Sequence, residues 1–146
     1  MTHNLPGFKS IEYGRPKSLF VDSKEIIMEG STVNLYGSFT GIPIVSLCGA
    51  VVTSEIVSGE TIYTTLLTFQ MKDCEDHTRS IINELVMNDC CFRLTDVYNK
   101  MFLLGLDKKP HPTVKPSFKT EIIPSGQRVH NVEITYINTI SILPLA

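Results

Sequence analysis

Hydrophobic and polar positions alternate along much of this chain with the two-residue period of β-strands. Residues 44–57 and 61–71 form two long runs rich in Val, Ile and Thr, separated by a short turn at Ser58-Gly59-Glu60. β-branched and aromatic residues favour strands, and a Gly-containing turn between two such runs is typical of a hairpin. Gly49 interrupts the first run and indicates a bulge or bend. These runs predict the strongest hairpin of the chain.

Shorter apolar runs predict further strands on both sides of this hairpin. They cover residues 19–21, 26–28, 32–36, 90–95, 101–106, 118–123, 129–139 and 141–145. The polar segment 96–100 separates two of these runs and predicts a second hairpin. Residues 108–116 contain three prolines, which remove ladder donors, so we expect an extended connector and not a central strand. A proline-rich ligand of an SH3-type domain is the alternative.

One segment has the period of a helix. In residues 76–88, apolar residues recur at three- and four-residue spacing, namely Ile81, Ile82, Leu85, Val86 and Met87. Asp73 or Asp76 is placed to cap the helix at its N-terminus, where carboxylates are favourable. The pattern therefore predicts a short amphipathic helix that packing on a sheet must stabilise.

The N-terminal segment breaks this regularity. Pro6-Gly7 and Gly14-Arg15-Pro16 interrupt residues 1–17, which we expect to form an arm that frays or lies across a neighbouring subunit. Residues 18–146 then form a single β-rich domain, since the chain length fits one domain. The predicted fold is mainly β, a β-sandwich or partly open barrel, with one α-helix packed on the sheet.

Composition narrows the range of partners. The chain has 146 residues, 42% of them hydrophobic and 19% charged, with a net charge of −2. This charge gives no general attraction to nucleic acid or to membranes. The sequence has neither the pattern of a secretory signal nor an apolar run of membrane-spanning length, so we expect a protein of the cytoplasm or of a virion.

Residues capable of chemistry are scattered. Cys48, Cys74, Cys90 and Cys91 contain no CxxC spacing, and we expect them to be buried or half-buried free thiols in a reducing compartment, with a zinc site as the alternative. Asp73, Glu75, Asp76 and His77 form the densest titratable cluster. Helix capping is the favoured role of this cluster, and a metal or acid–base site is the alternative. We find no nucleophile–base pair, metal motif or phosphate-binding loop, and therefore expect no enzymatic activity and no cofactor.

A local excess of basic residues lies between positions 100 and 128. We expect a solvated loop or an inter-subunit contact there, and contact with nucleic acid or an acidic partner is the alternative. The candidate partner-contact residues are Lys108, Lys109, His111, Lys115, Lys119 and Arg128.

The order of short motifs in the last third of the chain resembles that of a known class of protein. A strand ending in Asp, a short turn, a hydrophobic-Leu-Gly run, a basic proline segment and a closing hairpin follow one another. These motifs are Phe92-Arg93-Leu94-Thr95-Asp96, Asn99-Lys100, Phe102-Leu103-Leu104-Gly105, Lys109-Pro110, Gly126-Gln127-Arg128 and the alternating residues 132–137.

Over residues 90–146 this pattern resembles small virion proteins of tailed bacteriophages and prophages of gut bacteria. The turn has Asn-Lys where the commoner pattern has Asn-Gly. The resemblance implies a structural subunit of a tail or neck, without catalytic residues. Its partners would be further copies of itself or other structural proteins.

Overall fold

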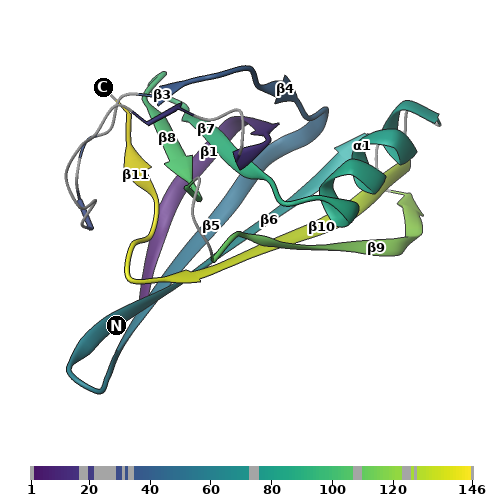
Figure 1. The fold of residues 1–146 in the computed structure, drawn as a ribbon. Coiled ribbons are helices and arrows are strands. Elements are labelled where there is room, and N and C mark those ends of the chain that lie inside the picture. Colours follow the sequence, from purple (N-terminus) through teal and green to yellow (C-terminus); the bar gives the residue numbers. More distant parts are fainter. Residues whose placement is uncertain are drawn as a thin grey trace.

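The computed structural model describes residues 2–16, 20–21, 29–30, 32, 35–72, 76–106, 110–122, 126 and 128–145. Within these ranges the chain forms a nine-stranded sheet, a two-stranded sheet and one helix (Figure 1). The helix is α1 (Asp76–Met87), and the small sheet pairs β2 (Phe20–Val21) with β3 (Leu35–Tyr36). The large sheet contains β1 (Thr2–Gly14), β4 (Thr40–Gly41), β5 (Ile44–Val57), β6 (Glu60–Lys72), β7 (Cys91–Asp96), β8 (Met101–Leu104), β9 (Thr113–Ile122), β10 (Arg128–Asn138) and β11 (Leu143–Pro144).

The large sheet is antiparallel and continuous. Its strand order is β11-β8-β7-β1-β5-β6-β10-β9, with β4 paired to β1. The expected mainly β fold with one helix packed on the sheet is confirmed. The expected bend in the first long strand is also present, since the register of β5 against β6 shifts between Val45 and Gly49.

The predicted N-terminal arm is wrong for most of its length. Residues Thr2–Gly14 form β1, which lies between β5 and β7 inside the sheet. The register of β1 against β5 shifts between Leu5 and Phe8, so Pro6 and Gly7 fall at this irregularity. A bulge tolerates a proline without an amide hydrogen and a glycine close to a neighbouring strand.

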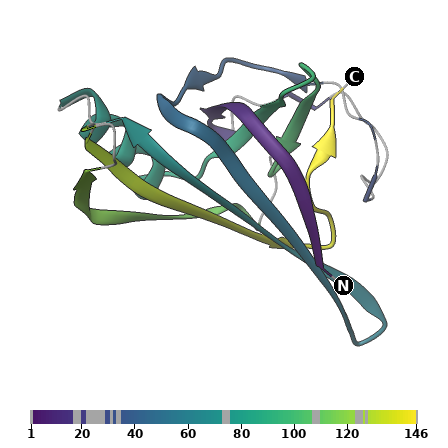
Figure 2. The ribbon, with the colours of Figure 1, turned by 180° about the vertical axis from the view of Figure 1, so that it is seen from behind.

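β1 joins the two halves of the sheet. Its first residues pair with β5, as Thr2 does with Thr53, and its last residues pair with β7, as Gly14 does with Cys91. Register shifts on both sides of Phe8 mark the change from one partner to the other. The pairing therefore passes from β5 to β7 along this single strand, which Figure 2 shows from behind.

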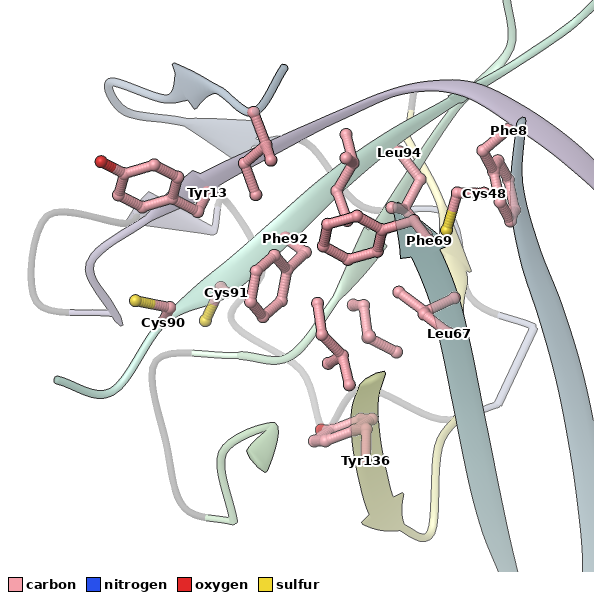
Figure 3. Packing of buried hydrophobic residues seen from close by; sticks show 14 of the residues in the cluster. Phe8, Tyr13, Cys48, Leu67, Phe69, Cys90, Cys91, Phe92, Leu94 and Tyr136 are labelled. Carbon is pink, nitrogen blue, oxygen red and sulfur yellow. The ribbon is translucent and has the colours of Figure 1, made fainter. Parts of the chain in front are cut away.

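The core lies between these two halves. Leu67 and Phe69 from β6, Phe92 and Leu94 from β7, and Tyr136 from β10 are all buried there (Figure 3). Strands that are distant along the sheet thus contribute to one core.

Helix α1 adds its apolar face to this core. Ile81 and Leu85 are buried at the predicted spacing, together with Thr78. Val86 and Met87 were expected on the same face but are exposed, because they follow Leu85 directly and turn away from the core. The Thr78 hydroxyl donates a hydrogen bond of 2.7 Å to the carbonyl oxygen of Lys72 and so fixes the start of the helix against the end of β6. The helix has 12 residues, and no helix in the described ranges is long and apolar enough to cross a membrane.

Candidate contact surfaces

The most prominent exposed feature is the end of the β5–β6 hairpin, which projects beyond the body of the protein (Figures 1 and 2). β1 accompanies β5 only as far as Thr53, and β10 accompanies β6 only as far as Tyr63. Beyond these residues the pairs Glu55–Ile62, Ile56–Thr61 and Val57–Glu60 have no flanking strand in the described part of the chain. A two-stranded ribbon without a third strand or a covered face is only marginally stable in water.

We call residues 55–62 the hairpin tip. Ile56 is 78% exposed and Val57 is 48% exposed, although both are large aliphatic residues. Glu55 and Glu60 are exposed beside them, and residues 53–64 contain no lysine or arginine. The hairpin tip therefore presents an apolar centre with two negative charges and no positive charge.

A second exposed apolar surface lies at the turn between β7 and β8. Asp96 builds this turn, because its buried Oδ1 accepts hydrogen bonds from the backbone N–H groups of Tyr98 (2.8 Å) and Lys100 (2.9 Å). The backbone N–H of Asp96 also donates to the carbonyl oxygen of Lys100, and Asn99 adopts the positive φ of 65° that Asn tolerates. Several hydrogen bonds between residues of the turn therefore hold its conformation.

This turn carries apolar and basic groups together. Tyr98 is 75% exposed, and Val97 and Met101 are each 46% exposed. Lys100 is exposed, and the ammonium group of Lys9 on β1 donates to Asn99. A shallow pocket of about 580 Å³ lies beside the turn, lined by Asn99, Lys100, Met101, Phe102, Pro144 and Leu145.

We call this pocket, together with Lys9, Val97 and Tyr98, the turn surface. The sequence predicted the β7–β8 hairpin but did not indicate this surface. The contribution of Lys9, Pro144 and Leu145 depends on strands that meet only in the folded sheet. The exposed Val97 and Tyr98 beside Asp96 are the local signal that could have indicated it.

The predicted basic contact residues do not gather into one surface in the described part of the chain. Lys115 is exposed on β9, where it lies directly opposite Glu133 of β10, so a carboxylate neighbours its charge. Arg128 is exposed near the other end of the β9–β10 pairing. Lys119 lies in β9, but its side chain is outside the described part, as are Lys108 and Lys109 altogether.

His111 is mostly enclosed. Its side chain is 11% exposed, and its Nε2 lies 4.0 Å from a carboxylate oxygen of Asp89. Its Nδ1 is buried and has no hydrogen-bond partner among the described residues. His111 therefore faces the protein more than the solvent, and the role of the basic stretch in contacting a partner stays a prediction.

The titratable cluster at the start of α1 lies only partly within the described residues. Asp76 and His77 are exposed in the first turn of the helix, while Asp73 and Glu75 are outside the described part. Among the described residues, no group of three His, Cys, Asp or Glu side chains is arranged to hold a metal ion.

Another polar cluster lies where α1 meets β1. The Tyr13 hydroxyl donates to Glu84 at 3.1 Å, and Arg15 lies 3.8 Å from the same carboxylate. Cys90 is buried beside them, and burial raises the pKa of its thiol. The Tyr13–Glu84 hydrogen bond joins α1 to β1 of the sheet.

Basic residues on the sheet also have structural partners. Arg93 on β7 binds Glu12 on β1 through two hydrogen bonds, of 3.1 and 2.7 Å, and lies 4.7 Å from the centre of the Phe39 ring. This paired and stacked arginine joins two adjacent strands.

Comparisons of the chain with protein-family models, with curated proteins and with solved structures found no match.

Proposed function

We propose that this protein is a non-enzymatic structural subunit that associates with further copies of itself through the hairpin tip. The observation that carries the proposal is the position of Ile56. This aliphatic side chain is 78% exposed at the end of a ribbon that no third strand supports within the described ranges.

The energetic argument concerns both the side chains and the backbone of the tip. Burying a large aliphatic side chain stabilises a contact by about 1.5–3 kcal/mol. Strand edges without a neighbour also present unpaired N–H and C=O groups, which soluble proteins usually protect with lysine, proline or a bulge. Residues 55–62 contain neither lysine nor proline. A partner that covers the tip would bury the exposed aliphatic side chains and pair the free backbone groups of the strand edges.

The resemblance of residues 90–146 to phage virion proteins extends this proposal to a subunit of a tail or neck. Such subunits assemble through repeated contacts between identical chains. The projecting hairpin supports the proposal because it places a contact surface away from the body of the subunit.

The test is the molar mass of the purified protein in a concentration series, measured by light scattering or sedimentation. We expect the wild type to associate as concentration rises and Ile56→Asn to weaken this association at least tenfold. Met87→Asn on α1 is a matched control, because Met87 is also 78% exposed but lies outside the tip. A wild-type protein that stays monomeric at the highest concentration, or equal weakening by both substitutions, would overturn the proposal.

A further inference from the structure

The hairpin tip and the turn surface lie at opposite ends of the molecule. In Figure 1 the tip of the β5–β6 hairpin is at the bottom, and the turn between β7 and β8 is at the top. The same separation holds in Figure 2, which is turned about the vertical axis. A single molecule therefore cannot bring the two surfaces together, whereas two molecules placed end to end can.

We propose that the hairpin tip docks on the turn surface of a second copy of this chain, in a head-to-tail contact. This inference rests on the proposed self-association and names the surface that receives the tip.

The apolar parts of the two surfaces suit each other. Ile56 and Val57 project from the tip, while Met101, Phe102 and Leu145 line the pocket of the turn surface. The narrow tip is convex and the pocket is concave. Apolar anchors that fill a pocket carry most of the energy of a typical protein contact.

Their charges are complementary. The tip carries Glu55 and Glu60, and the turn surface carries Lys9 and Lys100. The carboxylate within the turn, Asp96, is buried and already accepts two backbone hydrogen bonds. Among the described residues of the turn surface, the exposed charges are therefore those of lysines, and opposite charges favour this pairing over others.

The same charges oppose the symmetric alternative. If two hairpin tips met each other, four carboxylates would lie together without a positive charge from the tip residues. Like charges placed across an interface lower affinity and select against that partner. A tip-to-turn contact avoids this repulsion.

The turn surface is ordered before the tip arrives. The hydrogen bonds to Asp96 fix the backbone of the turn in the single chain, and the side chain of Lys9 donates to that of Asn99. A surface that is already ordered loses little conformational entropy on binding. Because the two contacting surfaces differ, the interface is heterologous, and repetition generates a ring or a filament.

Charge reversal tests this pairing. The tip variant Glu55→Lys/Glu60→Lys and the turn variant Lys9→Glu/Lys100→Glu should each weaken self-association at low salt at least tenfold. A 1:1 mixture of the two variants should restore it, because each tip then meets a turn surface of opposite charge. Lys72→Glu/Arg79→Glu, at exposed positions outside both surfaces, is the matched control for net charge and should associate like the wild type.

Far-ultraviolet circular dichroism checks that each variant is folded, and the neutral Lys9→Gln/Lys100→Gln should give an intermediate loss. The inference fails if the wild type associates and both turn variants, the Glu and the Gln pair, associate as strongly as the wild type does. It also fails if the tip variant binds the wild type more tightly than the wild type binds itself, because that result indicates tip-to-tip pairing. A monomeric wild type would instead remove the proposed function.

Discussion

At the scale of single residues, the interior combines apolar packing with thiols that are kept from solvent. Cys48, Cys90 and Cys91 are each at most 1% exposed. The expected burial is confirmed for these three cysteines, since Cys is among the residue types most often buried, while Cys74 lies outside the described residues. Burial raises the pKa of the Cys48 thiol to about 12, with a hydrogen bond from the backbone at Thr68 acting in the opposite direction.

This pKa predicts a loss of stability in alkali. Unfolding exposes Cys48 and returns its pKa to 9.0. The stabilisation of the folded state by the protonated thiol is therefore complete well below pH 9, and it declines as pH rises from 9 towards 12. From this thiol alone, the free energy of unfolding should fall by about 1.4 kcal/mol between pH 7 and pH 10. Urea unfolding at both pH values measures it, and Cys48→Ala should lack this part of the decline. Parallel pH profiles for the two proteins would contradict the prediction.

The sequence did not predict contacts between residues that are distant along the chain. His111 lies between two prolines, which suggested an exposed connector, but it packs near Asp89 after the chain folds back. Likewise, the pairing of Arg93 with Glu12 depends on the adjacent register of β7 and β1. No spacing in the sequence predicts either contact.

At the scale of elements, the hairpins and the helix were predictable because their signals are local. The expected strand 44–57 coincides with β5, and the expected helix 76–88 differs from α1 by one residue. β1 was missed because Pro6 and Gly7 interrupt its alternation. These two residues are compatible with a strand only because a bulge lies there, with Gly7 so close to Leu47 that a Cβ would approach Leu47 Cδ1 to 2.9 Å.

Substitutions at two neighbouring positions in the turn of the β5–β6 hairpin should change amide hydrogen exchange in opposite directions. Ser58 and Gly59 both have positive φ, of 51° and 84°, as a type I′ turn requires. Ser58→Asn should slow amide hydrogen exchange in the hairpin tip, because Asn tolerates this conformation better than Ser. Gly59→Val should accelerate exchange there, because a β-branched residue is strained at positive φ. Hydrogen exchange read by mass spectrometry distinguishes them, and unchanged protection in both variants would contradict the turn assignment.

At the scale of the whole molecule, β1 joins the two parts of the large sheet, which would be separate without it. It provides the connection between β5 and β7, and its Ile11 is 1% exposed in the core. The mainly β class could be inferred from the sequence, but not this connection, because it requires residues 8–14 to pair with the distant residues 91–96.

Removal of β1 should therefore abolish cooperative folding. A chain without residues 2–14 should show no cooperative thermal transition by circular dichroism, whereas loss of a peripheral arm would leave the melting temperature nearly unchanged. Ile11→Ala is a milder version and should lower the free energy of unfolding by about 2–5 kcal/mol. A truncated protein that melts like the wild type would show that β1 is dispensable.

The position of β1 also has a consequence during synthesis on the ribosome. β1 is synthesised before β7, and its second half must wait for that strand, because Ser10 and Gly14 pair with Thr95 and Cys91. Contacts between such distant segments slow folding, and strands that wait without partners are prone to aggregate. The second half of β1 therefore stays without its β7 partner until residue 96 has been translated, which favours production at low temperature or with a chaperone that shields β1.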